Sequence, residues 1–274
     1  MGKQPKEMSF LNHLEELRWT LVRSTVAIFG FGIIAFMLKS FIFNSIILAP
    51  KNVNFWTYRF MCNLSKSFGT EGLCVDEIPF VVQSRTMAGQ FSAHIWTSIA
   101  AGFIMAFPFI IWEVWKFIKP ALYKKEQKGA AVFITISSIL FFVGILFGYY
   151  IITPLSVNFL GSYTVADEVK NNIDLSSYIG LLKASVLASG MIFEMPIVIY
   201  FLSKMGLVTP TFLKKYRKYA LILVLILAAI ITPPDIISQI IVAIPMLILY
   251  ELSIFISARV LKNALKKEKK VKVT

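Results

Sequence analysis

Long apolar segments fill most of the chain and are separated by polar stretches. Six of these segments are candidate membrane helices: 21–43, 91–115, 130–153, 178–203, 217–232 and 236–258. A helix needs about 20 mostly apolar residues to cross a bilayer, and the first four segments meet this requirement. The fifth ends at Pro233, and Gln239 and Glu251 interrupt the sixth. We therefore expect short fifth and sixth spans that thin the bilayer locally, the alternative being that flanking lysines and arginines snorkel to the interface.

The regions outside the spans also have distinct patterns. Within residues 1–20, Phe10, Leu14 and Leu17 recur at helical spacing, which predicts an amphipathic helix at the membrane surface before the first span. Residues 44–90 form a long polar loop, and residues 259–274 form a basic tail. Prolines within or beside the spans are expected to bend helices.

Composition supports a membrane protein. The chain has 274 residues, of which 57% are hydrophobic and 16% charged, and its mean hydropathy is +0.72. Soluble domains average about 45–50% apolar and 25% charged residues, so a soluble globule and a disordered chain are excluded. The prediction is an all-α polytopic membrane protein with one membrane domain over residues 1–274.

The net charge is +13, and the distribution of the basic residues along the chain indicates a topology. Lysine and arginine are concentrated in the N-terminal segment, in the loops after the second and fourth spans, and in the tail. Basic residues accumulate in cytoplasmic loops, so six spans with both termini in the cytoplasm fit this distribution, and residues 44–90 become a periplasmic loop. Because the charge follows topology and no basic module lies outside the spans, nucleic-acid binding is not predicted.

The only two cysteines, Cys62 and Cys74, lie in the 44–90 loop. They can form a disulfide if the loop faces an oxidising compartment, and two free thiols are the alternative. Their spacing is not that of a metal site, so no metal or other cofactor is predicted.

Catalytic machinery is not visible in the sequence. It contains no G-x-x-x-x-G-K-[ST] loop, no H-E-x-x-H and no G-x-S-x-G turn. The chain is therefore not predicted to be an enzyme.

One acidic residue, Glu194, falls near the middle of the fourth span and precedes Pro196. A charge there costs at least about 3 kcal/mol, so the side chain should face water, protein or a partner. A protonated Glu194 bonded to a carbonyl freed by Pro196 is the alternative. Lys183 lies about three turns earlier on nearly the same face, so a secondary transporter binding a small solute or a proton at Lys183 and Glu194 is the alternative function.

Two cytoplasmic acids are ambiguous from pattern alone. Glu16 lies off the apolar stripe of the first helix, which is typical of a solvated charge. Glu126 is isolated among lysines, which is typical of a local ion pair.

Taken in order along the chain, several motifs nevertheless resemble one family. They are His13-Leu14-Glu15-Glu16-Leu17-Arg18, Ala49-Pro50, Val114-Trp115-Lys116-Phe117-Ile118, Pro120-Ala121-Leu122-Tyr123-Lys124-Lys125-Glu126, Phe193-Glu194-Met195-Pro196, and Thr232-Pro233-Pro234-Asp235 with Ser238-Gln239. This set resembles TatC, the multi-spanning receptor of the twin-arginine protein translocase, over nearly the whole chain.

The resemblance implies six helices in a curved, glove-like wall in the bacterial cytoplasmic (inner) membrane. It implies recognition of the twin-arginine signal peptides of folded cargo, transport driven by the proton-motive force, and oligomers with small single-span partners of the TatA and TatB type in a lipid environment.

The resemblance also suggests roles for individual residues. Signal-peptide binding is carried over to Glu16, Arg18, Phe117 and Glu126; intramembrane or partner contacts to Glu194, Pro196 and Gln239; and further sensitive positions to Pro50 and Asp235. The chain departs from the family pattern at Thr20, where a basic residue is common, and in its longer first periplasmic loop.

Overall fold

The computed structural model describes residues 10–67, 69, 74–75, 77–119, 130–166, 168–169 and 171–272, with the backbone alone at 10–12, 130, 237 and 264–272. It divides into two compact units, each described separately below. Helix α5 (Ala130–Phe147) contributes its first part to one unit and its last part to the other.

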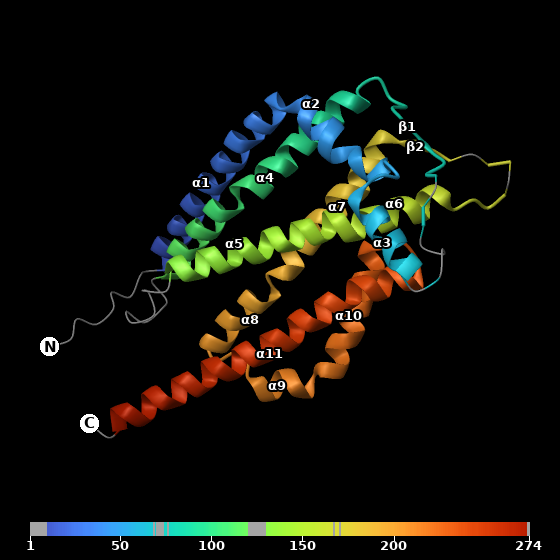
Figure 1. Ribbon diagram of the computed structural model, residues 1–274. Coiled ribbons are helices and arrows are strands. Elements are labelled where there is room, and N and C mark those ends of the chain that lie inside the picture. Colours follow the sequence, from blue (N-terminus) through green and yellow to red (C-terminus); the bar gives the residue numbers. More distant parts are fainter. Residues whose placement is uncertain are drawn as a thin grey trace. The chain divides into compact units, whose positions relative to one another are not determined.

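The first unit consists of helices alone. Besides the start of α5, its elements are α1 (Phe10–Met37), α2 (Lys39–Phe41) and α4 (Gly89–Ile118) (Figure 1). Helices α1 and α4 pack closely because glycine faces glycine where they meet. A Cβ atom added at Gly102 would overlap the carbonyl oxygen of Ile28 and come within 2.8 Å of the Cα of Gly32. Small residues allow such close approach of membrane helices.

The N-terminal segment differs from the sequence prediction. Residues 1–9 of the surface helix predicted over 1–20 lie outside the described residues. From Phe10 onward there is no separate surface helix, because α1 runs without a break from Phe10 to Met37. No proline or glycine lies between Phe10 and Phe29 to end the first helix, so it continues directly into the membrane-type segment.

The second unit contains the remaining elements together with the last part of α5. They are η1 (Ile42–Ile47), η2 (Ala49–Lys51), α3 (Trp56–Ser67), β1 (Val81–Gln83), η5 (Gly148–Ile152), α6 (Thr153–Ser162), β2 (Asn172–Asp174), α7 (Leu175–Phe193), α8 (Met195–Lys204), α9 (Pro210–Lys215), α10 (Arg217–Ile231) and α11 (Ile236–Lys272).

Three helix pairings hold this unit together. Gly144 and Gly148 lie directly against α7, and the Ser189 hydroxyl donates to the Gly144 carbonyl oxygen at 2.6 Å. Helix α8 packs along α11, where the Ser203 hydroxyl donates to the Ser257 hydroxyl at 2.7 Å. Helices α10 and α11 form a hairpin with an apolar core that includes Val224, Ala228, Val242 and Met246.

A short parallel pair, β1 with β2, makes the all-α prediction wrong in detail. Val81 pairs with Asn172 and Gln83 with Asp174. Arg85 secures the pair, because its Nη2 donates to the Asn172 carbonyl oxygen at 2.7 Å and its backbone N–H donates to the Asp174 carboxylate at 3.2 Å. The same carboxylate caps α7 by accepting from the Ser176 backbone N–H at 3.0 Å.

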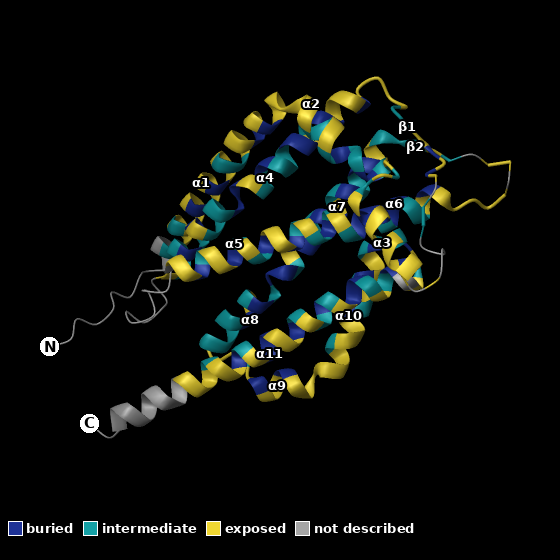
Figure 2. Cartoon of the chain, viewed as in Figure 1, coloured by how far each residue is buried: buried dark blue, intermediate teal, exposed yellow. Residues whose placement is uncertain are grey.

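Five described helical segments are long and apolar enough to cross a membrane: His13–Met37, Gly89–Ile118, Ala131–Ser162, Leu175–Lys204 and Ser238–Asn263. Helix α10, with 15 residues, is about 22 Å long and falls short of the roughly 30 Å hydrocarbon core. Large apolar side chains remain exposed along α1 and α5, which suits lipid-facing surfaces. Figure 2 shows exposed positions along both helices.

The prediction of a short sixth helix was wrong. Helix α11 has 37 residues, and its apolar segment continues past both polar residues that were expected to interrupt it. The Gln239 amide donates to the Leu225 carbonyl oxygen across the hairpin at 3.1 Å, and Glu251 accepts from Arg217 at 2.7 Å. Because each polar group has a partner on a neighbouring helix, the helix does not have to end there.

Candidate functional site

The first unit contains an open cavity of about 340 Å³. Its walls come from the first half of α1 and the last turns of α4. The lining residues are Glu15, Glu16, Trp19, Thr20, Arg23, Glu113 and Lys116. Three carboxylates and two cations therefore share one small space.

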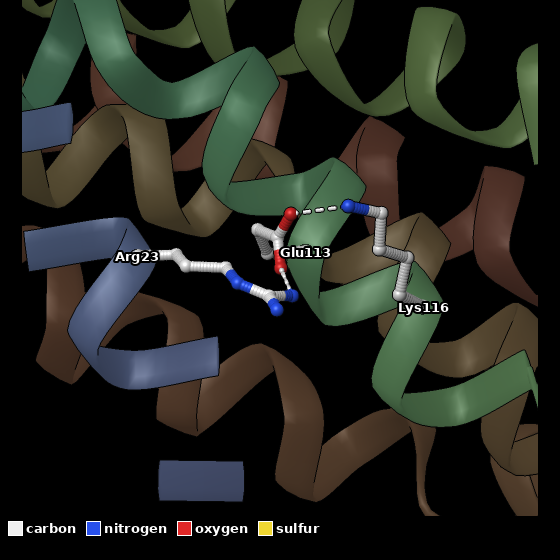
Figure 3. A network of polar contacts seen from close by, with 3 residues as sticks. All are labelled: Arg23, Glu113 and Lys116. Carbon is white, nitrogen blue, oxygen red and sulfur yellow. Dashed lines mark hydrogen bonds and ion pairs between the residues drawn. The ribbon is translucent and has the colours of Figure 1, made fainter. Parts of the chain in front are cut away.

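Glu113 is the buried centre of this cluster. Its side chain is only 2% exposed, so its charged carboxylate is removed from solvent. Oε2 accepts from Arg23 Nη1 at 3.3 Å, and Oε1 accepts from Lys116 Nζ at 2.5 Å (Figure 3). A buried carboxylate is tolerated when cations and hydrogen bonds compensate for its lost hydration, and Arg23 and Lys116 supply both here.

Arg23 and Lys116 also have favourable surroundings besides Glu113. The side chains of Arg23 and Lys116 are 55% and 40% exposed, so both also meet solvent. The Lys116 ammonium lies 3.8 Å from the centroid of the Trp112 ring, a favourable cation–π position. Since Arg23 belongs to α1 and Lys116 to α4, the network also joins the two helices.

Glu16 has a different environment. Its Oε2 atom is shielded from solvent, and within the described part of the chain it has no hydrogen-bond partner. Neighbouring Glu15 is exposed. A buried carboxylate oxygen without a partner carries a free-energy penalty that a bound donor would remove.

The other predicted signal-peptide residues lie close by along the same helices. The Arg18 guanidinium lies 5.8 Å from the centroid of the Trp19 ring, and Phe117 stacks on His13 at 4.3 Å between ring centroids. Neither Arg18 nor Phe117 lines the cavity. Glu126 lies outside the described residues.

Sequence reasoning missed Arg23, Glu113 and Lys116 as members of this site. Lys116 was named only as part of the Val114-Trp115-Lys116-Phe117-Ile118 motif, and Arg23 and Glu113 were not assigned to any site. A signal was present in the i, i+3 spacing of Glu113 and Lys116 at the end of an otherwise apolar helix.

The remaining predicted positions belong to the second unit. Glu194 is only 8% exposed and occupies the break between α7 and α8, where its carbonyl oxygen accepts from the backbone N–H groups of Ile197 and Val198. Pro196 follows in the first turn of α8 and is buried. The break is expected here because proline cannot donate the hydrogen bond that would continue α7.

Three other positions take part in structural hydrogen bonds. The Pro50 carbonyl oxygen accepts from the Tyr58 hydroxyl at 2.9 Å, and Asp235 accepts from the Ser238 backbone N–H at 2.8 Å at the start of α11. Gln239 joins α11 to α10, as described above. These three residues shape the turns and the hairpin that contain them.

Cys62 and Cys74 are joined by a disulfide that connects α3 to the segment after it. Within the described residues, no group of histidine, cysteine, aspartate and glutamate side chains is arranged to hold a metal ion.

The apolar helices and the polar cavity define a polytopic helical membrane protein. Comparison with known proteins specifies the class further. The family model described as Sec-independent protein translocase protein (TatC) matches residues 12–245. The chain therefore belongs to the TatC family.

Relatives and solved structures agree with this assignment. A Sec-independent protein translocase protein TatC from Blattabacterium sp. subsp. Periplaneta americana is 42% identical over 96% of this chain and 100% of its own length. The TatC protein of Aquifex aeolicus is 35% identical over 96% of this chain and 99% of its own. A crystal structure of a twin-arginine translocase receptor TatC superposes with a TM-score of 0.68 at 33% identity, covering 90% of this chain and 99% of that one. The chain is thus a protein-translocase component with multiple membrane helices.

Proposed function

We propose that this protein recognises twin-arginine signal peptides at its cytoplasmic face, with the cavity of the first unit receiving one of the two arginines. One observation carries the proposal: Glu16 presents a shielded carboxylate oxygen that has no hydrogen-bond donor in the described part of the chain. A guanidinium group entering the open cavity would supply that donor.

The charges around the cavity favour Glu16 over Glu113 as the receiving group. Glu113 is already compensated by Arg23 and Lys116, so an incoming cation would have to displace one of them. Glu16 has no such competitor among the described residues. Trp19, which also lines the cavity, offers an aromatic face on which a guanidinium can stack.

Arginine fits this arrangement better than lysine. Its planar guanidinium stays charged and can donate two parallel hydrogen bonds to one carboxylate, whereas an ammonium group acts as a point charge. We propose that Glu126 receives the second arginine, and that Arg18 and Phe117 contact the peptide beside the pair.

For the second unit, we propose that Glu194 and Pro196 form a polar break facing the signal peptide's apolar segment or single-span partners of the TatA and TatB type. Gln239 would contribute to the same contacts, while Pro50 and Asp235 maintain the local turns. With these partners the protein would form oligomers in the bacterial cytoplasmic (inner) membrane and move folded cargo at the expense of the proton-motive force.

The proposed topology has six spans and cytoplasmic termini, with α10 as the short fifth span. The alternative of a secondary transporter at Lys183 and Glu194 is not favoured, since the family and its relatives are protein-translocase components.

Site-specific photocrosslinking tests the recognition proposal. A photoreactive residue at position 16 or 126 is expected to capture a signal peptide with Arg-Arg and to capture a Lys-Lys version much less. A photoreactive residue at exposed Leu21, which lies on the same helix but does not line the cavity, is the control for nonspecific capture. Equal capture of both peptides at position 16 would contradict the proposal.

A further inference from the structure

Helix α3 exposes an apolar stripe. Trp56, Phe60 and Leu64 recur every four residues and are 56%, 50% and 44% exposed. The Trp56 ring stacks on the Phe60 ring with centroids 5.2 Å apart. Such a run of large apolar side chains is costly in water and indicates a surface that is covered in the working protein.

The opposite face of α3 is attached to its own unit. Thr57, Tyr58 and Ser65 are buried. The Tyr58 hydroxyl lies 2.9 Å from the carbonyl oxygens of both Pro50 and Pro154, which share its one proton as acceptors. The Thr57 hydroxyl donates to the carbonyl oxygen of Tyr150. Burial raises the pKa of Tyr58 well above its usual value, so the hydroxyl stays protonated and remains a donor. Helix α3 therefore cannot rotate its apolar stripe inward without breaking these bonds.

Helix α3 is attached to the carbonyl oxygens of Tyr150 and Pro154, where the hydrocarbon core should end. The span that contains Tyr150 and Pro154 begins at Ala131. Twenty residues at about 1.5 Å each cover the roughly 30 Å hydrocarbon core, which places its far boundary close to Tyr150. Tyrosine and tryptophan are enriched at this boundary, and Tyr149, Tyr150 and Trp56 gather there.

The apolar stripe is also continuous with the exposed surface of this span. Trp56 contacts Tyr150 edge-on, with ring centroids 5.9 Å apart, and Tyr150 is itself exposed. The outward surface of a membrane span meets lipid, so the same lipid can extend over Trp56 and its neighbours.

The charges on α3 match a membrane surface. Arg59 and Lys66, two turns apart, are exposed beside the apolar stripe, and the helix contains no acidic residue. Basic residues flanking an apolar stripe are typical of helices that lie in the interface and attract anionic headgroups.

We propose that α3 is an interfacial membrane anchor whose Trp56, Phe60 and Leu64 enter the outer part of the bilayer while Arg59 and Lys66 bind anionic lipid phosphates. The Cys62–Cys74 disulfide links the segment that follows α3 to this anchor. The anchor does not depend on signal-peptide recognition, which concerns the other unit.

Depth measurements on the full chain in lipid nanodiscs test the anchor. The variants Phe60→p-acetylphenylalanine and Lys66→p-acetylphenylalanine each receive a nitroxide through the ketone, which leaves the disulfide intact. We expect the label at position 60 to collide severalfold more with oxygen than with a water-soluble nickel chelate, and the label at position 66 to show the reverse. If the label at position 60 collides with the nickel chelate as often as the label at position 66 does, the helix lies in water. If the label at position 60 is shielded from both reagents, protein covers the apolar stripe. Either result overturns the proposal.

Lipid composition tests the role of the charges. The oxygen preference at position 60 should increase when phosphatidylglycerol replaces phosphatidylcholine, and Arg59→Gln combined with Lys66→Gln should remove this increase. A change that persists in the double variant, or no change in the native sequence, would overturn the assignment of anionic lipid to these two residues.

Discussion

At the residue scale, the buried carboxylate of Glu113 joins α1 and α4, whereas the carboxylate of Glu16 in the same cavity has an oxygen without a described partner. Glu113 is balanced by Arg23 and Lys116, and Glu16 keeps an oxygen without a partner in the described chain. The two acids therefore have different environments although they line the same cavity. In the function proposed above, Glu113 is structural and Glu16 receives the ligand.

Removing the charge of Glu113 should destabilise the first unit moderately. Glu113→Gln is expected to lower the free energy of unfolding by about 1–2 kcal/mol, because hydrogen bonds to charged groups are lost while the partly exposed Arg23 and Lys116 regain some hydration. Arg23→Gln should cost less, since Lys116 stays on the carboxylate. Thermal unfolding in detergent measures both variants, and a larger loss for Arg23→Gln would contradict this ranking.

Because of Asp174, the stability of the β1–β2 pair should decrease at acidic pH. The Arg85 backbone N–H, the Ser176 N–H and hydroxyl, and the Arg85 charge lower the pKa of the Asp174 carboxyl below its usual value near 4. Because the pKa of Asp174 is lower in the folded than in the unfolded state, the ionised carboxylate stabilises the fold. This stabilisation is fully present above the unfolded-state pKa and is lost as the pH falls through the folded-state pKa. Hydrogen exchange at the Arg85 amide should therefore accelerate below about pH 4 relative to the expected intrinsic rate. In Asp174→Asn this additional acceleration should be absent, and an unchanged profile in the variant would refute the assignment.

Sequence alone could not reveal these contacts. Arg23 and Glu113 are 90 positions apart, and Arg85 and Asp174 are 89 apart. Local periodicity does not pair residues at such separations. Glu16 was named only through family resemblance, because its position off the apolar stripe indicates no more than a polar face.

At the element scale, hydropathy located most helices because lipid-facing segments must be apolar over their whole length. The predicted 91–115, 178–203 and 217–232 correspond closely to α4, to α7 with α8, and to α10. The continuity of α1, the length of α11 and the β1–β2 pair were not predicted. Each depends on tertiary contacts or on the absence of a local break, which hydropathy does not report.

Close helix crossing in the second unit should make Gly144 intolerant of a side chain. A Cβ there would lie 2.7 Å from the Ser189 carbonyl oxygen and 2.8 Å from the Cα of Gly190, so Gly144→Ala must separate α5 from α7. We expect a loss of about 1–3 kcal/mol. Gly180→Ala in α7 is the matched control, because nothing lies within 4 Å of its added Cβ, and it should be neutral or slightly stabilising. Equal thermal stability of the two variants would contradict the described packing.

At the scale of the whole molecule, the proposed six-span topology requires α10 to cross the membrane despite its 15 residues. That proposal puts both termini in the cytoplasm and the turn at Pro234 on the opposite side. Cysteines introduced at each terminus should react with an impermeant maleimide only in inside-out vesicles, and Pro234→Cys only in intact cells with a permeable outer membrane. Termini that label from opposite sides would remove α10 from the set of spans.

The most direct test of signal-peptide recognition is the affinity of the purified full chain for a signal peptide, compared between Glu16→Gln and Glu15→Gln. We expect Glu16→Gln to weaken binding of the Arg-Arg peptide about tenfold or more, and exposed Glu15→Gln to change it by no more than about threefold. The Lys-Lys peptide should bind weakly to all forms. Unchanged Arg-Arg affinity in a folded Glu16→Gln variant would contradict the account.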